Sequence, residues 1–409
     1  MSSAASSAHG HGHADTRPAD VARLTDDQGK KLVSTAGGVA AVGVLAMAAA
    51  YLSDKERFAY SYLPAFAWFV TLGLGALMFI LIQHLTRASW SVAVRRQAEW
   101  LTNLLPVGLI LFIPVAAFAH QLYHEWMGPE AAKDPAVMKK VAYLNASGFY
   151  VRALIFFVLW SAIAFWYSNT SKDQDTAGGL EHHRRMQKWA APAILLTAPT
   201  LTLGGIDWLM SLDPHWYSTI FGVYIFAGAM TSSHAALALM TISLQNRGFF
   251  NRVSTVEHQH DVGKLLFGWT VFFAYIGFSQ FFLIWYANIP EETIFFIRRT
   301  HHGWENISLL ILFGHFVLPF LVLMSRHAKR SKPVLAGAAV WMLFMHWVDM
   351  YWLVMPSHDT ELHLQWQDLA TALGPFGIAC LVVAVAASKS SLYPLKDPFI
   401  PETLKNENL

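Results

Sequence analysis

Residues 59–82 have the sequence AYSYLPAFAWFVTLGLGALMFILI, which contains no charged side chain. A helix needs about 20 apolar residues to cross the hydrocarbon core of a bilayer, so this stretch is long enough to span a membrane. Outward from it, in both directions, the chain supplies nine further apolar stretches of similar length. Because backbone polar groups in lipid must be hydrogen-bonded within the protein, the pattern predicts an all-α polytopic membrane protein of about ten transmembrane helices.

The composition agrees with this prediction. Apolar residues make up 55% of the chain and charged residues only 14%, which excludes an ordinary soluble domain. The net charge of +2 gives no indication of nucleic-acid binding. The one cysteine, Cys380, cannot by itself ligate an iron–sulfur cluster, form a disulfide or attach a c-type haem. Electrons that pass nearby would have to be carried by a partner chain.

The positions of Lys and Arg predict the orientation of the helices. We expect ten crossings, at Leu32–Leu52, Ala59–Ile82, Leu101–Tyr123, Ser147–Ser168, Ala190–Met210, Tyr217–Leu244, Lys264–Ala287, Asn306–Met324, Val334–Val354 and Leu369–Ala387. Basic residues gather in alternate connections and in both tails, whereas the connections at 213–216 and 356–368 contain none. By the positive-inside rule, both termini are expected in the cytoplasm, which agrees with an even number of crossings.

Three segments outside the long apolar stretches have their own patterns. Residues 87–100 place Trp90 and Val94 opposite Arg87 and Arg95, which predicts a cytoplasmic interfacial helix or an extension of the third crossing. The tail at 389–409 contains three prolines and is expected to be extended and to lie on a neighbour. Residues 1–31 are polar and contain no apolar core, so we expect a cytoplasmic tail and not a cleavable signal peptide.

A faint internal repeat predicts two bundles. Residues 118–121 resemble 278–281, and residues 206–209 resemble 348–351, each pair four crossings apart. Crossings four apart have the same orientation, so the repeat is a parallel one; the alternative is a chance likeness between apolar helices. The predicted parts are a first peripheral helix at 32–58, four-helix bundles at 59–212 and 213–355, and a second peripheral helix at 356–388.

Charged residues inside apolar spans are functional candidates because burying them in lipid is costly. Asp207 follows a run of Thr, Pro and Gly at 197–205, which predicts a broken helix lining an ion or substrate site. The alternative is a structural pair with a nearby arginine. Arg152 lies inside the fourth crossing and is expected to pair with Asp207, Asp213 or Asp349, because an unpaired buried charge costs several kcal/mol.

The second predicted bundle contains most of the buried histidines. His346 and Asp349 are three residues apart and share one helix face, an arrangement suited to a proton relay, to hydrogen bonding of a quinone carbonyl, or to a simple interhelical bond. His234 and His315 lack the repeated pairing expected of haem b ligands, which leaves proton relay or interhelical bonding. A polar file through this bundle is expected to include Tyr224, Ser232, Ser233, Tyr275, Ser279 and Gln280.

Polar clusters flank the second bundle on both sides. Glu257 and His258 precede the seventh crossing on the expected cytoplasmic side, where they either collect protons or form a solvated loop. The connection at 291–305 is rich in both charge signs. We expect it to dock an extrinsic partner or to close the outer end of the bundle.

Three strings together resemble a known family. They are GIDWLMSLDPHWYS at 205–218, KLLFGW at 264–269, and FSQF at 278–281 with WYANIPEET at 285–293. They are similar to the NrfD/polysulfide-reductase-type membrane subunits, in particular to the smaller such subunit of alternative complex III, over nearly the whole chain after Lys30.

This resemblance implies a fold and a function. It implies two four-helix bundles with flanking helices, in a quinol:electron-acceptor oxidoreductase whose iron–sulfur clusters and haem c lie in other subunits. The implied partners are a larger NrfD-like subunit, to which quinol oxidation is usually credited, an iron–sulfur subunit and c-type cytochrome subunits. The smaller subunit is more often discussed as a proton path.

The expected function is therefore a membrane subunit without a cofactor or metal of its own and without catalytic residues, which provides a proton path. Its candidates are Asp207, His234, His315, His346, Asp349, Glu257 and His258. One alternative is a quinone-binding subunit with an outer-half pocket or ion-pair set formed by Arg152, Asp207, Asp213 and Asp349. A second alternative is a free-standing secondary transporter.

Overall fold

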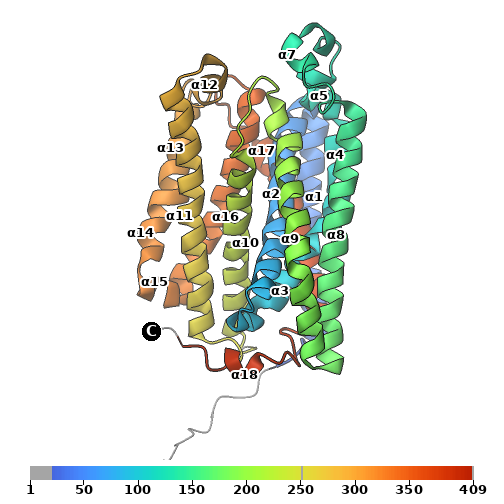
Figure 1. Ribbon diagram of the computed structural model, residues 1–409, viewed down its shortest axis with the longest axis vertical. Helices are drawn as coiled ribbons and strands as arrows, with labels where there is room; N and C mark the ends of the chain where they lie inside the picture. The colour runs from blue at the N-terminus through green and yellow to red at the C-terminus, as the bar shows by residue number, and fades with distance from the viewer. Residues whose placement is uncertain (1–20, 250–251, 408–409) are drawn as a thin grey trace, which may run out of the picture.

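The computed structural model describes residues 21–249 and 252–407 (Figure 1). Within these ranges there is no strand, and ten helical spans are long and apolar enough to cross a membrane. The predicted all-α, ten-span fold is confirmed. The spans are α1 (Asp26–Ser53), α2 (Lys55–Leu85), α3 with α4 (Val92–Thr102, Leu104–Ala117), α8 (Ala146–Ala177), α9 (Leu180–Trp208), α10 (Phe221–Asn246), α11 (Val256–Ala287), α13 with π-helical η4 and α14 (Trp304–Leu310, Ile311–Val317, Leu318–Met324), α16 (Lys332–Val354) and α17 (Trp366–Lys389).

Short helices occupy the connections and the C-terminal segment. They are η1 (Ser89–Ser91), α5 (Ala119–Leu122), α6 (His124–Met127), η2 (Ala131–Lys133), α7 (Pro135–Met138), η3 (Met210–Leu212), α12 (Pro290–Ile297), α15 (Arg326–Arg330), η5 (Met355–Ser357) and α18 (Ile400–Thr403). In Figure 1, α5, α7 and α12 lie at one end of the spans and α18 at the other. We call the end with α18 the terminal face and the other end the opposite face.

Polar side chains in the connections fix where several spans begin. The Thr25 hydroxyl accepts a hydrogen bond from the Gln28 amide, and the Gln28 side chain accepts one from the Thr25 amide. At the starts of α2 and α8, the side chains of Asp54 and Asn145 accept hydrogen bonds from the amides of Arg57 and Gly148. Such caps satisfy backbone N–H groups that have no partner within the helix. The Thr25 cap begins α1 at Asp26, earlier than the expected Leu32.

The ten spans form two four-helix bundles and a flanking pair. In the first bundle α2, α4, α8 and α9 pack in a ring, and in the second α10, α11, the α13–α14 span and α16 do the same. The two rings meet where α2 packs against α10. Gly75 allows this close approach, because a Cβ atom built there would lie 2.0 Å from the carbonyl oxygen of Ala229.

The two peripheral helices, α1 and α17, pack along each other and against α2. Glycines allow their backbones to touch, as is common between membrane helices. A Cβ atom built at Gly43 would lie 2.2 Å from the Leu373 carbonyl oxygen, and one built at Gly377 would lie 2.7 Å from Ala40 Cα. Helices from the two ends of the chain thus form one element beside the bundles.

Of the two interpretations of residues 87–100, the structure supports an extension of the third crossing and contradicts an interfacial helix. Every residue of α3 is buried, including Arg95 and Arg96, and the segment continues into the third span through a break at Asn103. The reason is electrostatic: Arg96 pairs with Glu99 and Asp175, so its charge is neutralised inside the protein.

Two further expectations differ from the structure. The predicted break before Asp207 is absent, since α9 is continuous from Leu180 to Trp208. The Thr200 hydroxyl, next to Pro199, donates to the Leu196 carbonyl of the same helix at 2.7 Å. The C-terminal segment lies on its own chain, with the Gln97 side chain donating to the Leu392 carbonyl at 3.1 Å. Residues 1–20 of the predicted N-terminal tail lie outside the described residues.

Candidate functional site

A cluster of titratable side chains lies inside the second bundle. Its members are Tyr224 on α10, His315 on η4, and His346 with Asp349 on α16. Tyr224 is 5% exposed and the other three are fully buried. The structure therefore gathers three of the predicted proton-path residues, together with the first residue of the predicted polar file. We call these four residues the bundle cluster.

One hydrogen bond joins the cluster internally and another joins it to the first bundle. The Tyr224 hydroxyl donates to Asp349 Oδ1. His346 Nε2 lies 2.8 Å from the Thr71 hydroxyl of α2, and Thr71 also bonds the Ala67 carbonyl at 2.7 Å. When Thr71 donates to that carbonyl, His346 Nε2 carries the ring proton and Nδ1 is an acceptor.

The cluster retains polar atoms that no described residue satisfies. These atoms are Asp349 Oδ2, His346 Nδ1 and both ring nitrogens of His315. Leaving a buried polar atom unpaired costs about 1–3 kcal/mol, and such groups in folded proteins mark sites of function or bound water. The cluster therefore has the capacity to accept and pass protons.

The helices around the cluster are shaped to hold it. His315 lies in the π-helical segment η4, and π-helical turns occur frequently at functional sites. Trp341 Nε1 donates to the Gly314 carbonyl of η4 at 2.7 Å. The ring of Phe273 packs between members of the cluster, with its centroid 4.2 Å from that of His315 and 4.9 Å from that of Tyr224.

Three of the other proton-path candidates lie nearer the terminal face, whereas Asp207 lies at the far end of α9 in the first bundle. His234 is buried on α10, ten residues from Tyr224 and thus about 15 Å along the helix, and its Nδ1 lies 2.7 Å from the Met230 carbonyl. Glu257 pairs with Arg330 at 2.5 Å. His258 is fully buried and its Nδ1 accepts from the Thr255 amide at 3.1 Å. His258 thus belongs to a folded helix start, and a solvated loop is not found there.

Part of the predicted polar file does not face the bundle interior. Ser232 and Ser233 are buried on α10, as the prediction requires. Tyr275, however, is 63% exposed, so the prediction was wrong for this residue. α11 buries the face that carries Phe273 and Gln280 and turns the face of Tyr275 outward.

In the first bundle, Arg152 pairs with Asp207. Arg152 Nε lies 2.7 Å and NH2 3.1 Å from the two carboxylate oxygens, and the guanidinium lies 4.1 Å from the Tyr143 ring centroid. Asp213 instead pairs with Arg298 at 3.0 Å. The four quinone-pocket candidates therefore lie at three separate places, since Asp349 belongs to the bundle cluster.

A cavity of about 280 Å³ opens at the opposite face, beside this ion pair. Tyr143, Ile206, Asp213 and Trp216 are among its lining residues. Arg152 and Asp207, which pair with each other, are not among its lining residues.

Polar atoms gather next to this cavity. Glu125, Asp213 and His215 bring ligand-type atoms within 4.8 Å of one another, which is the one grouping of a metal-binding kind among the described residues. Burial and the neighbouring Asp213 raise the pKa of Glu125. His215 Nε2 pairs with Asp134 at 2.6 Å and Arg298 pairs with Asp213, whereas the buried Glu125 Oε2 has no hydrogen-bond partner among the described residues.

Three buried polar groups were missed by the sequence analysis. Arg57 at the start of α2 binds both carboxylate oxygens of Asp368, at 2.9 and 2.7 Å. His84 and His183 have ring centroids 5.7 Å apart in the first bundle, and none of their ring nitrogens has a partner among the described residues. Arg57 was overlooked because Lys55 and Glu56 beside it indicate an aqueous connection.

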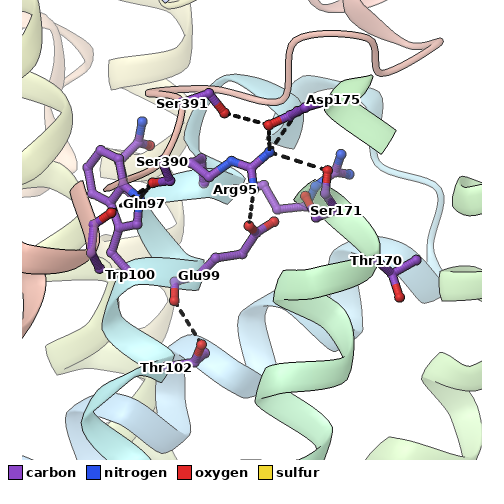
Figure 2. A network of polar contacts seen from close by, with 12 residues as sticks. Arg95, Gln97, Glu99, Trp100, Thr102, Thr170, Ser171, Asp175, Ser390 and Ser391 are labelled. Atoms are coloured by element: carbon purple, nitrogen blue, oxygen red, sulfur yellow. Dashed lines mark hydrogen bonds and ion pairs between the residues drawn. The ribbon is translucent and has the colours of Figure 1, made fainter. Parts of the chain in front are cut away.

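The third group lies near the terminal face and joins α3, α8 and the C-terminal segment (Figure 2). Asp175 accepts from Arg96 at 2.8 Å and from the Ser391 hydroxyl at 2.7 Å. Trp100 donates to Ser390 at 2.8 Å. The residues of this third group are far apart in sequence, so no local sequence pattern predicts the group.

Comparison with protein-family models gives no match for this chain, and no curated protein matches it either.

Proposed function

We propose that this chain is a membrane subunit of a quinol-oxidising electron-transfer complex, the smaller NrfD-like (ActF-type) subunit of alternative complex III. In this proposal the chain carries no redox centre and provides a path for protons across the membrane. Iron–sulfur clusters and haem c belong to partner subunits, and the terminal face lies in the bacterial cytoplasm, in keeping with the basic connections on that side.

The observation that carries the proposal is the bundle cluster with its unsatisfied atoms. An acid, a phenol and two imidazoles are buried together inside a membrane bundle, where ionisable groups are costly and usually functional. Asp349 Oδ2 is free to accept a proton, while Oδ1 of the same carboxylate accepts a hydrogen bond from the Tyr224 hydroxyl. His346 sits one helical turn away and offers Nδ1 as the next acceptor.

The rest of the path runs along α10. His234 lies between the cluster and the terminal face, and the hydroxyls of Thr231, Ser232 and Ser233 are buried in the interval. Each hydroxyl donates to a carbonyl of its own helix and retains acceptor capacity. His258 and Glu257 stand at the terminal end of this route.

The test is proton transport by the intact complex in proteoliposomes. We expect Asp349→Asn to lower quinol-driven proton uptake about 10²-fold, the range for removing one positioned acid–base group, while uncoupled quinol oxidation continues. Tyr224→Phe should lower it less, because the carboxylate remains. Tyr275→Phe is the matched control and should change nothing, since its ring faces outward. An unchanged proton-to-electron ratio in Asp349→Asn would reject the proton path.

One observation favours a second candidate, a quinone site. The cavity of about 280 Å³ at the opposite face is lined by Tyr143, Trp216 and Asp213, and clefts with aromatic walls and few polar groups suit small ligands. Loss of quinol turnover in Trp216→Ala, with proton uptake per electron unchanged, would favour this candidate. Unaltered turnover in that variant would remove it.

A further inference from the structure

A second cavity lies between the flanking helix pair and the two bundles, on the terminal side. It has a volume of about 480 Å³ and is lined by side chains of α1, α2, α3, α10, α16 and α17 and by Phe249 and Leu392. Most of the lining is apolar, with Leu32, Val39 and Val383 as examples. We call it the leaflet groove, and it is separate from the bundle cluster.

The length of the leaflet groove matches one leaflet of a bilayer. Its lining runs from Gln28 to Val39 on α1, from Ala236 on α10 to Arg247 just beyond it, and from Phe376 to Ala387 on α17. Each stretch advances eleven residues, or about 16 Å at 1.5 Å per residue. Half of a hydrocarbon core about 30 Å thick is about 15 Å.

The groove is closed at its membrane-interior end. Trp68 Nε1 donates to the Leu343 carbonyl at 3.0 Å, and the Trp68 ring lies 6.2 Å from that of Phe376. All three residues line the groove. A transmembrane helix of a partner would need to continue past this floor, so the shape suits a molecule that occupies one leaflet only.

The open end of the groove carries a positive charge. Arg247 lines the groove just beyond α10 and is exposed, and its guanidinium has no hydrogen bond or ion pair with any described residue. Gln28 and Ser243 are polar residues that also line the groove. Arginine binds phosphate through two parallel N–H donors, and a cation near the membrane surface attracts anionic lipids.

We infer that the leaflet groove binds an anionic phospholipid, with its acyl chains between α10 and the α1–α17 pair and its phosphate on Arg247. The lipid would fill the space between the flanking pair and the bundles. Neither the quinol chemistry nor the proton path is needed for this inference.

The test is photo-crosslinking in nanodiscs that contain the full chain in its native complex. The probes are phosphatidylglycerol and phosphatidylcholine with a diazirine in the acyl chain, and adducts are mapped by mass spectrometry. We expect adducts within residues 236–247 and 376–387, with phosphatidylglycerol preferred. Arg247→Gln should lower phosphatidylglycerol labelling about fivefold, the effect of about 1 kcal/mol per interfacial cation. Arg184→Gln is the matched control, because Arg184 is also exposed and without a described partner, and it should have no effect.

Two further variants make the result decisive. Ala384→Phe fills the groove at a buried position and should abolish labelling by both lipids. Cys380, the one cysteine of the chain, lines the groove and should react with maleimide more slowly when phosphatidylglycerol is present. Equal labelling by the two lipids with no effect of Arg247→Gln, absence of adducts from both segments, or displacement of phosphatidylglycerol by a quinone analogue would each overturn the inference.

Discussion

Among single residues, Arg152 and Asp207 carry the clearest energetic consequence. Asp207 is 1% exposed, whereas the Arg152 side chain is 18% exposed, and the two form a bidentate ion pair between α8 and α9. Removing one partner of a buried pair leaves an uncompensated charge, which costs about 3–5 kcal/mol. Replacing both partners with apolar groups is often neutral.

We therefore predict different results for single and double variants. Asp207→Asn should destabilise the protein by about 3 kcal/mol, somewhat less than a fully buried pair because Arg152 reaches solvent. The combination of Asp207→Leu with Arg152→Met should restore most of the stability. Thermal unfolding in detergent measures both. A double variant as unstable as the single one would show that the ion pair itself, and not the stranded charge, holds α8 to α9.

At the scale of helices, α1 and α17 depend on glycine where their backbones touch. Gly43 faces the Leu373 carbonyl oxygen, and a methyl group there would lie 2.2 Å from it. Gly38, one and a half turns earlier on α1, has nothing within 4 Å of the same position. The two glycines therefore allow the same substitution to be compared in contact and in open space.

We predict opposite effects for alanine at these two positions. Gly38→Ala should be neutral or stabilising by up to about 1 kcal/mol, because alanine is the better helix former. Gly43→Ala should destabilise by about 1–3 kcal/mol, because the flanking helices must separate. The thermal midpoints of the two variants, measured side by side, give the comparison. Equal midpoints would mean that α1 does not pack closely on α17.

Helices were predictable from sequence where the signal is local. Ten spans follow from apolar length alone, and the pairing of Arg152 with an outer-half aspartate follows from the cost of a lone charge. The burial of α3 was not predictable, because Arg96 is neutralised by Asp175, 79 residues away. The same holds for His346, whose partner Thr71 is 275 residues away.

For the candidate site, sequence identified its residues but not its grouping. His315, His346 and Asp349 were found because titratable residues are rare in apolar spans. Tyr224 joins them, whereas Tyr275 does not, because of the way α10 and α11 are rotated about their axes. Apolar patterning does not determine this rotation when a helix is apolar on every side. In such a helix the apolar residues are not concentrated on one side, so the sequence does not indicate which side faces the bundle interior.

At the scale of the whole molecule, the C-terminal segment connects elements from both bundles. Asp397 pairs with the buried Arg95 of α3, and the Leu395 amide donates to Asp175 of α8 at 2.8 Å. Further along, Asn406 donates to Asp261 of α11 at 2.7 Å. Figure 1 shows this segment crossing beneath the spans at the terminal face.

This arrangement predicts that removing residues 392–409 destabilises the entire chain. Arg95 is 1% exposed, and without Asp397 its charge would be stranded at a cost of about 3–5 kcal/mol. We expect the thermal midpoint of the truncated protein to fall by several degrees, and Asp397→Asn alone to reproduce most of that fall. Glu402→Gln is the matched control, since Glu402 is an exposed carboxylate on the same segment, and it should leave the midpoint unchanged. A truncated protein as stable as the full chain would mean that water reaches Arg95 and that the segment lies on the bundles without holding them together.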